Sequence, residues 1–152
     1  MQTKEVFNKL ALLCSRKEYC SYDLSQKMRK WEISEEIQEK IIEDLKKEKY
    51  LDEKRFSEAF VKDKFRFNKW GKQKIKYQLR QKRISEFNIE NAFEQITDED
   101  YVDMIDTLLI TKNKSVKAKN SYEQKNKLLR FMTQRGFEIE DVLKQIEKIL
   151  LD

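Results

Sequence analysis

The sequence predicts an all-α protein of three tandem three-helix repeats that form an elongated, solenoid-like chain. Its 152 residues include no proline and only two glycines, which leaves almost no material for β-hairpins. Apolar residues recur at the spacing of one helix face in segment after segment. The same order of segments returns at a period of about fifty residues, as in a chain made of stacked copies of one unit.

Residues 1–49 form the first predicted repeat. Its first helix covers residues 4–16, and Ser21 and Ser34 are the predicted N-caps of its second and third helices. Each helix is too short to be stable alone, so it must bury one apolar stripe against its two partners. The three stripes are Val6, Phe7, Leu10, Ala11, Leu13 and Cys14, then Leu24, Met28 and Trp31, then Ile37, Ile41, Ile42 and Leu45.

Residues 50–97 form the second predicted repeat, on the same plan. Asp52 is the predicted N-cap of its first helix, residues 68–71 form a turn, and Ser85 begins its third helix. The predicted stripes are Phe56, Ala59, Phe60 and Phe67, then Ile75 and Leu79, then Ile89, Ala92, Phe93 and Ile96. Phe65 and Tyr77 lie off these stripes, so stacking of their rings on nucleic-acid bases is a hypothesis for them.

Residues 98–152 form the third predicted repeat. A lysine-rich segment without an apolar stripe, residues 111–120, is expected to be a mobile loop. A basic helix follows Ser121, and Gly136 has the position of a helix-terminating glycine. The predicted stripes are Tyr101, Val102, Ile105, Leu108 and Leu109, then Leu128 and Met132, then Ile139, Val142, Leu143, Ile146 and Leu150.

A fixed offset aligns the repeats. Moving 53 positions along the chain takes five apolar residues of the second repeat to apolar residues of the third, from Ile75, Leu79, Ile84, Ile89 and Phe93 to Leu128, Met132, Phe137, Val142 and Ile146. Moving 51 positions back takes the first three of them to Leu24, Met28 and Ile33. One shared register favours true repetition.

Charge alternates along the chain in long blocks. Residues 62–83 hold ten basic side chains against one acid, whereas residues 84–108 hold eight acids and no base. Basic residues that recur three or four apart on a helix repel one another, a cost that binding a polyanion or an acidic protein face would explain. Residues 112–135 carry a looser excess of seven positive charges. A solvated lysine-rich surface is the alternative interpretation of both blocks.

The sequence offers no signal of bond chemistry. It contains no histidine, no phosphate-binding glycine loop and no nucleophile elbow, so we expect a protein that is not an enzyme and has no metal or cofactor. Cys14 and Cys20 are expected to be free thiols. Without an apolar run of about twenty residues or a secretory signal, the expected location is cytoplasmic.

The run from Leu51 to Ser85 resembles the central repeat of the RecX family of bacterial recombination regulators. The family often has glycine at the place of Arg83, and the third repeat keeps this glycine as Gly136. The features that match are the opening Leu51-Asp52, the helix with Phe56 and Phe60, the turn Trp70-Gly71, the helix with Ile75 and Leu79, and the step Lys82-Arg83-Ile84.

The resemblance implies tandem three-helix domains similar to helix-turn-helix folds. It also implies a regulatory protein that lodges in the groove of the RecA filament on single-stranded DNA. Such proteins inhibit RecA strand exchange, ATPase and co-protease activity in DNA repair and the SOS response. We therefore expect a cytoplasmic monomer with weak direct DNA binding of its own.

The candidate site residues fall into two groups. Those expected to bind the filament or nucleic acid are basic side chains of the second and third repeats: Lys62, Arg66, Lys69, Lys72, Lys76, Arg80, Arg83, Lys125, Lys127 and Arg130. Those expected to carry the structural pattern of the family are Phe56, Phe60, Trp70, Gly71, Ile75, Leu79 and Gly136.

Two other hypotheses remain open. In the first, the protein is an autonomous helix-turn-helix reader of duplex DNA, with Gln73 and Gln78 available for base edges. It should then prefer its own site by ~1,000-fold or more over random DNA. In the second, it is a helical adaptor whose lysines only keep it in solution, and it would have no measurable affinity for nucleic acid at low salt.

Overall fold

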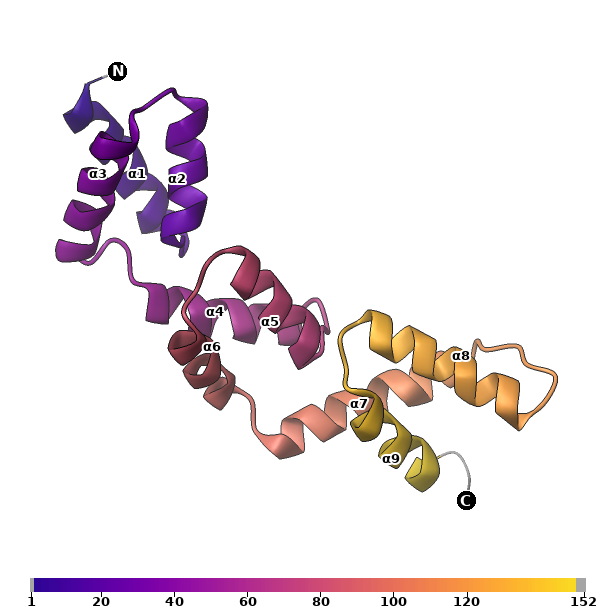
Figure 1. The fold of residues 1–152 in the computed structure, drawn as a ribbon. Helices are drawn as coiled ribbons and strands as arrows, with labels where there is room; N and C mark the ends of the chain where they lie inside the picture. The colour runs from indigo at the N-terminus through magenta and orange to yellow at the C-terminus, as the bar shows by residue number, and fades with distance from the viewer. Residues whose placement is uncertain (1, 150–152) are drawn as a thin grey trace. The chain divides into compact units, whose positions relative to one another are not determined.

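The computed structural model describes residues 2–149, in which all regular secondary structure is helical (Figure 1). Leu150, expected in the last apolar stripe, lies outside the described residues. The helices follow the predicted order, and a 3₁₀ turn, Phe93–Gln95, extends the sixth. The α-helices are α1 (Thr3–Arg16), α2 (Ser21–Lys30), α3 (Glu35–Lys47), α4 (Glu53–Arg66), α5 (Lys72–Gln81), α6 (Glu86–Ala92), α7 (Asp98–Asn113), α8 (Ser121–Gln134) and α9 (Ile139–Ile149).

The chain divides into two compact units. The first contains the residues up to Phe60 together with Leu79–Ala92, and the second contains Val61–Gln78 together with the residues from Phe93 onward. Helices α4 and α5 therefore contribute to both units. The division into repeats at residues 49 and 97 follows sequence periodicity and stays a prediction.

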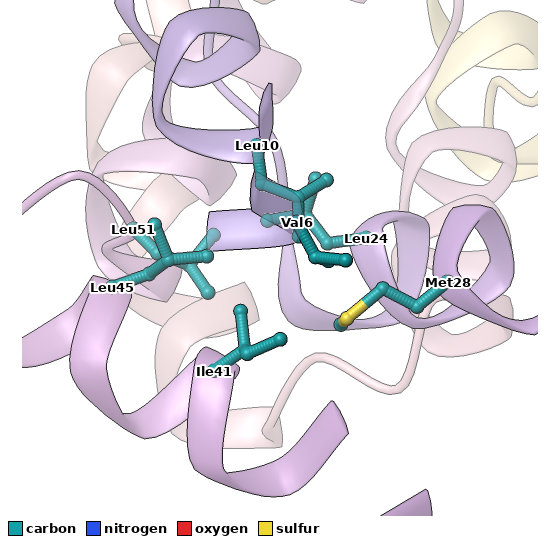
Figure 2. Close-up of a cluster of buried hydrophobic side chains, with 7 residues drawn as sticks. All are labelled: Val6, Leu10, Leu24, Met28, Ile41, Leu45 and Leu51. Atoms are coloured by element: carbon teal, nitrogen blue, oxygen red, sulfur yellow. The ribbon is translucent and has the colours of Figure 1, made fainter. Parts of the chain in front are cut away.

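One hydrophobic core of the first unit lies among α1, α2 and α3. Figure 2 shows side chains from all three helices, and Leu51 from the segment after α3, gathered around one centre. They are the predicted stripe residues Val6, Leu10, Leu24, Met28, Ile41 and Leu45. Burying a side chain of this size contributes about 1.5–3 kcal/mol, so this cluster is the main source of stability for the three short helices.

Polar contacts attach the start of α4 to α2 within the first unit. Glu53 accepts hydrogen bonds from the backbone N–H and the hydroxyl of Ser21, at 2.7 and 2.6 Å. Ser21 is the first residue of α2 and Cys20 is its N-cap, so the prediction of Ser21 as the N-cap is wrong. Lys82 forms an ion pair of 2.6 Å with Asp23 of α2.

The predicted caps of three other helices are confirmed. The Ser34 hydroxyl accepts a long hydrogen bond of 3.5 Å from the Ile37 N–H at the start of α3. Asp52 accepts one of 3.0 Å from the N–H of Arg55, and Ser85 accepts one of 3.2 Å from the N–H of Asn88. These side chains satisfy backbone donors that a helix start leaves without a partner.

The third repeat lies wholly within the second unit, where α7, α8 and α9 pack on one another. Two stripe predictions are wrong here, since Val102 and Ile139 are exposed. Helix α7 also continues to Asn113, three residues into the segment predicted to be a loop. The stripe residues that the structure buries are Tyr101, Ile105, Leu108, Leu109, Leu128, Met132, Val142 and Ile146.

The second helix of each repeat ends in the same turn. After α8, Gly136 has a φ of +96°, and the N–H of Phe137 donates to the Met132 carbonyl at 3.2 Å. After α5, Arg83 has a φ of +60°, and the N–H of Ile84 donates to the Leu79 carbonyl at 3.1 Å. The departure from glycine at Arg83 therefore keeps the Schellman geometry, with a non-glycine residue in the left-handed conformation.

Glu32 holds the equivalent turn after α2 with a φ of +59°. A non-glycine residue in this conformation costs about 1–2 kcal/mol relative to glycine. Substitution by glycine removes this strain, but the greater conformational freedom of glycine in the unfolded chain offsets part of the gain. We therefore expect Glu32→Gly to raise the free energy of unfolding by about 0.5–1 kcal/mol, measured by chemical denaturation. The matched control is Glu48→Gly, because Glu48 ends α3 with a φ of −88°. The control should lower stability, and equal losses in both variants would contradict the role of the turn.

Candidate nucleic-acid interface

The only two glycines of the chain meet each other in the second unit. A Cβ atom on Gly71 would lie 2.4 Å from the carbonyl carbon of Gly136, and a Cβ atom on Gly136 would lie 2.4 Å from the Cβ of Lys74. The Gly71 N–H donates to the Arg135 carbonyl at 2.7 Å, and the Gln73 N–H donates to the Gly136 carbonyl at 3.0 Å. Carbonyls at the end of α8 thus accept hydrogen bonds from backbone N–H groups at the start of α5, and the absence of a side chain at Gly71 permits this close approach.

Tyr101 completes this junction from α7. Its hydroxyl accepts a hydrogen bond of 3.0 Å from the Lys72 N–H and donates one of 2.7 Å to Glu138. Its ring is stacked at 5.9 Å on Phe65 and lies 5.4 Å from Phe137. Burial raises the pKa of the Tyr101 hydroxyl, and its bond to Glu138 acts in the same direction. The side chain is therefore neutral and fixed at both ends.

Arg135 attaches α8 to the turn after α4. Its guanidinium donates to the carbonyls of Asn68 and Lys69 at 3.1 and 3.3 Å, and its Cζ lies 5.3 Å from the centroid of the Phe131 ring. Arg135 is absent from the predicted site residues, as are Tyr101 and Glu138. Their roles depend on partners 29 to 67 positions away in the chain, for which a single sequence carries no signal.

Three predicted basic residues lie in the second half of α4 and in the turn after it. Lys62, Arg66 and Lys69 are all exposed, and their side chains form no ion pair with any residue between positions 2 and 149. Lys62 and Arg66 are four apart on α4, so they share one side of the helix. Lys69 follows with a φ of +56°. These three cations form the α4 basic cluster.

Other predicted cations of the second repeat are engaged within the protein. Lys72 and Lys76 are half-buried and lie over the rings of Tyr101 and Phe93, at 4.5 and 5.4 Å from the centroids. Arg80 makes a two-pronged ion pair with Glu86, at 2.8 and 3.2 Å. Because of these contacts, Lys72, Lys76 and Arg80 are less available to bind an external anion.

Arg83 belongs to the first unit and lies 5.4 Å from the centroid of the Tyr22 ring. Arg80 is in the first unit as well, whereas Lys62, Lys69 and Lys76 belong to the second. The predicted basic residues of the second repeat are therefore divided between the two compact units.

The predicted cations of the third repeat lie on α8. Arg130 is exposed and Lys125 is half-buried, and neither forms an ion pair in the described part of the chain. Lys127 is paired at 3.1 Å with Glu123, one turn earlier. This bond lowers the pKa of the Glu123 carboxyl.

The aromatic predictions are partly confirmed. Phe56 is buried, and Phe60 is packed against it with ring centroids 5.7 Å apart. The Trp70 ring has the ammonium groups of Lys64 and Lys74 within 5.1 Å of its centroid. The other predicted motif residues, Ile75 and Leu79, are fully buried.

Phe65 and Phe67 have exchanged their predicted places. Phe65 is only 5% exposed, so it is core rather than a stacking platform. Phe67, predicted to be buried, is 79% exposed and directly follows Arg66, the last residue of α4. Tyr77 lies off the buried stripe as predicted and is exposed.

The described residues contain no group of histidine, cysteine, aspartate or glutamate side chains placed to hold a metal ion. Between positions 2 and 149, no helix is both long and apolar enough to cross a bilayer. Cys14 and Cys20 are free, as expected, and burial raises the pKa of the Cys20 thiol to about 12. A thiol in this state is a poor nucleophile.

Two family models match the helical repeats that carry the junction. Residues 52–92 match the second three-helix domain of RecX, and residues 98–146 match its third three-helix domain. The chain belongs to the RecX family. The resemblance of residues 51–85 to the central repeat of this family is thereby confirmed, and so is the all-helical repeat fold.

Curated relatives carry the same family name. The chain is 32% identical over 131 residues to regulatory protein RecX of Clostridium acetobutylicum, which covers 82% of this chain and 60% of that protein. It is 28% identical to regulatory protein RecX of Chlorobium phaeobacteroides, over 96% of this chain and 94% of that protein. The chain spans 48% and 43% of the RecX proteins of Leuconostoc mesenteroides and Oceanobacillus iheyensis.

Solved RecX structures share the fold. The structure of RecX from Lactobacillus salivarius superposes with a TM-score of 0.86 at 21% identity, over 99% of this chain and 97% of that one. A second crystal structure of regulatory protein RecX gives a TM-score of 0.87 at 20% identity, over 96% of this chain and 73% of that one. The shared architecture is therefore preserved at low sequence identity.

Proposed function

We propose that this RecX protein binds the RecA filament on single-stranded DNA as a non-enzymatic monomer. It inhibits RecA strand exchange, ATPase and co-protease activity, and so acts in DNA repair and the SOS response in the cytoplasm. Family membership supports this role, since the relatives are named regulatory proteins. The observation that carries it is the α4 basic cluster, whose three exposed cations have no ion-pair partner in the described part of the chain.

The cluster suits a partner that presents phosphates or carboxylates. Lys62 and Arg66 are four apart on one helix side, where like charges repel by a few tenths of a kcal/mol. A polyanion removes that repulsion and releases counterions, which favours binding without reading a base sequence. Lys125 and Arg130 on α8 are two further cations of the same unit without an ion-pair partner among the described residues. Arg80 and Lys127 contribute less, because Glu86 and Glu123 partly neutralise them.

The alternative of a duplex reader is less favoured. The recognition helix of a helix-turn-helix protein contacts base edges with its N-terminal residues. At the start of α5, the N–H groups of Gly71, Lys72 and Gln73 are bonded to Arg135, Tyr101 and Gly136. The end of α8 therefore lies where a base edge would have to approach.

The test is inhibition of RecA ATPase on single-stranded DNA by the triple variant Lys62→Glu, Arg66→Glu, Lys69→Glu. We expect the half-inhibitory concentration to rise at least about tenfold, because each change replaces an attraction by a repulsion. The matched control is Lys40→Glu, Lys54→Glu, Lys144→Glu, which has the same net charge and alters exposed residues of α3, α4 and α9. The control should inhibit like the wild type.

The outcomes separate the site from the function. If the wild type does not inhibit RecA, the proposed function is wrong. If the wild type and both variants inhibit equally, the function stands and the α4 basic cluster is not the contact. If the two variants lose inhibition equally, net charge rather than a particular surface is responsible.

A further inference from the structure

A basic pocket lies in the third repeat, between the end of α7, the following loop and α8. Its volume is about 370 Å³. Four of its lining side chains are cationic, whereas none of its described lining residues is acidic. The lining residues that matter to its chemistry are Lys112, Ser115, Lys117, Lys127, Arg130 and Phe131.

The wall of the pocket is held in place by local hydrogen bonds. The N–H groups of Ser115 and Val116 donate to the Lys112 carbonyl at 3.0 and 3.1 Å, and so does the Ser115 hydroxyl at 3.0 Å. The Lys127 ammonium reaches the Lys117 carbonyl, which ties the loop to α8. The segment predicted to be a mobile loop thus forms one side of a defined cavity.

The cationic side chains of the pocket differ in their contacts with other residues of the protein. Lys127 is paired with Glu123, and Lys112 lies 4.9 Å from the centroid of the Phe131 ring. Lys117 and Arg130 are exposed and form no ion pair among residues 2–149. Gathering like charges around one cavity costs free energy, and nothing in the packing of α7 on α8 requires it.

The pocket is built for charge rather than for a nucleobase. Lys112 and Arg135 both lie within 5.3 Å of the Phe131 ring centroid, so a base could stack there only by displacing a cation. A phosphate group needs several donors of positive charge, and lysine and arginine supply them. Successive phosphates of a nucleic-acid strand can reach a pocket at the end of a repeat without any requirement for sequence.

We propose that this pocket binds a phosphate group of a single-stranded nucleic-acid backbone, with Lys117 and Arg130 as its principal ligands. Lys112 and Lys127 add to the local potential. The site lies outside the α4 basic cluster and acts on the nucleic acid itself, so it does not depend on the proposed action on RecA.

The test is binding of a fluorescein-labelled oligothymidylate to the full chain, measured by anisotropy over a series of KCl concentrations without RecA. The variant is Lys117→Gln, Arg130→Gln, and the control is Lys40→Gln, Lys144→Gln, with the same loss of charge at exposed sites elsewhere. We expect the pocket variant to bind more weakly, with a salt slope shallower by about 0.7, since each phosphate neutralised on a single strand contributes about 0.7. The control should keep at least the larger part of the wild-type slope.

Two competitors distinguish the source of the phosphate. Inorganic phosphate and ADP are added at constant ionic strength, with thermal unfolding as a second readout. If either stabilises the wild type but not the pocket variant, the pocket binds phosphate from a free ligand, and the assignment to a strand is overturned. If the pocket variant binds the oligonucleotide with the wild-type affinity and slope, the pocket is not a phosphate site. An unchanged melting temperature of the variant shows that its folding is intact.

Discussion

Gly71→Ala is expected to lower the free energy of unfolding by about 3 kcal/mol, as overpacking costs about 1–3 kcal/mol and each lost hydrogen bond adds about 1. The added Cβ would lie 2.4 Å from three backbone atoms of Gly136 and Phe137. Backbone moves less readily than the end of a side chain, so the start of α5 must separate from the end of α8. The bonds from Gly71 to Arg135 and from Gln73 to Gly136 would be lost with it.

The measurement is chemical denaturation in a Trp31→Phe background. The chain has two tryptophans, so Trp70 then reports alone from the position beside Gly71. Thr107→Ala is the control, since Thr107 is exposed on α7 and should change stability by no more than about 0.5 kcal/mol. A change in Gly71→Ala as small as that of the control would show that the two backbones can move apart without cost.

Tyr101→Phe is expected to lower the free energy of unfolding by about 2 kcal/mol, because two part-buried hydrogen bonds of about 1 kcal/mol each are lost. The phenylalanine ring keeps the contacts with Phe65 and Phe137, but the Lys72 N–H loses its acceptor and Glu138 loses its donor. Tyr77→Phe is the matched control, because Tyr77 is exposed and its hydroxyl makes no hydrogen bond within the described residues. Equal stability of the two variants would contradict a role for the buried hydroxyl.

The same side chain predicts a loss of stability at alkaline pH. Burial raises the pKa of Tyr101 in the folded protein, whereas an unfolded tyrosine ionises near pH 10. The stabilisation is therefore complete below about pH 10 and decreases as the pH rises above it, by up to about 1.4 kcal/mol per pH unit. Denaturation at pH 8 and pH 11 should show a smaller difference between wild type and Tyr101→Phe at the higher pH. A constant difference would mean that the hydroxyl is free to ionise in the folded state.

Apolar periodicity was sufficient to predict the helices and most of the core. Ile75 and Leu128 are 53 positions apart in the sequence, and both are completely buried at equivalent places in their repeats. The caps Asp52 and Ser85 were also predictable, because a capping side chain bonds within its own first turn. Such features depend only on residues that are close together in the sequence, so a single sequence is enough to predict them.

The buried face of α4 was not predictable in the same way. Its first half belongs to one compact unit and its second half to the other, so the buried side moves from Phe56 to Val61 and Phe65. A single helical stripe continued from Phe56 and Phe60 leads instead to Phe67, which is exposed. One helix that packs in two units does not keep one period.

The candidate site was predictable in its charge but not in its availability. The basic block was evident from composition, yet whether a cation is free depends on acids elsewhere in the fold. Arg80 meets Glu86 across the turn after α5, whereas Arg66 meets no acid in the described residues. The pocket between Lys117 and Arg130 depends on how the loop folds back on α8, which residue types alone do not determine.

The turn after the second helix of each repeat has a consequence for recognising distant copies of this domain. Glu32, Arg83 and Gly136 all adopt the left-handed conformation although only one of them is glycine. Carbonyls of the preceding helix accept hydrogen bonds from the amide of each of these residues and from the amide that follows it. A search pattern that demands glycine there would find one copy in this chain and overlook two. The spacing of the apolar residues on either side of the turn is the more reliable pattern for recognising related three-helix repeats.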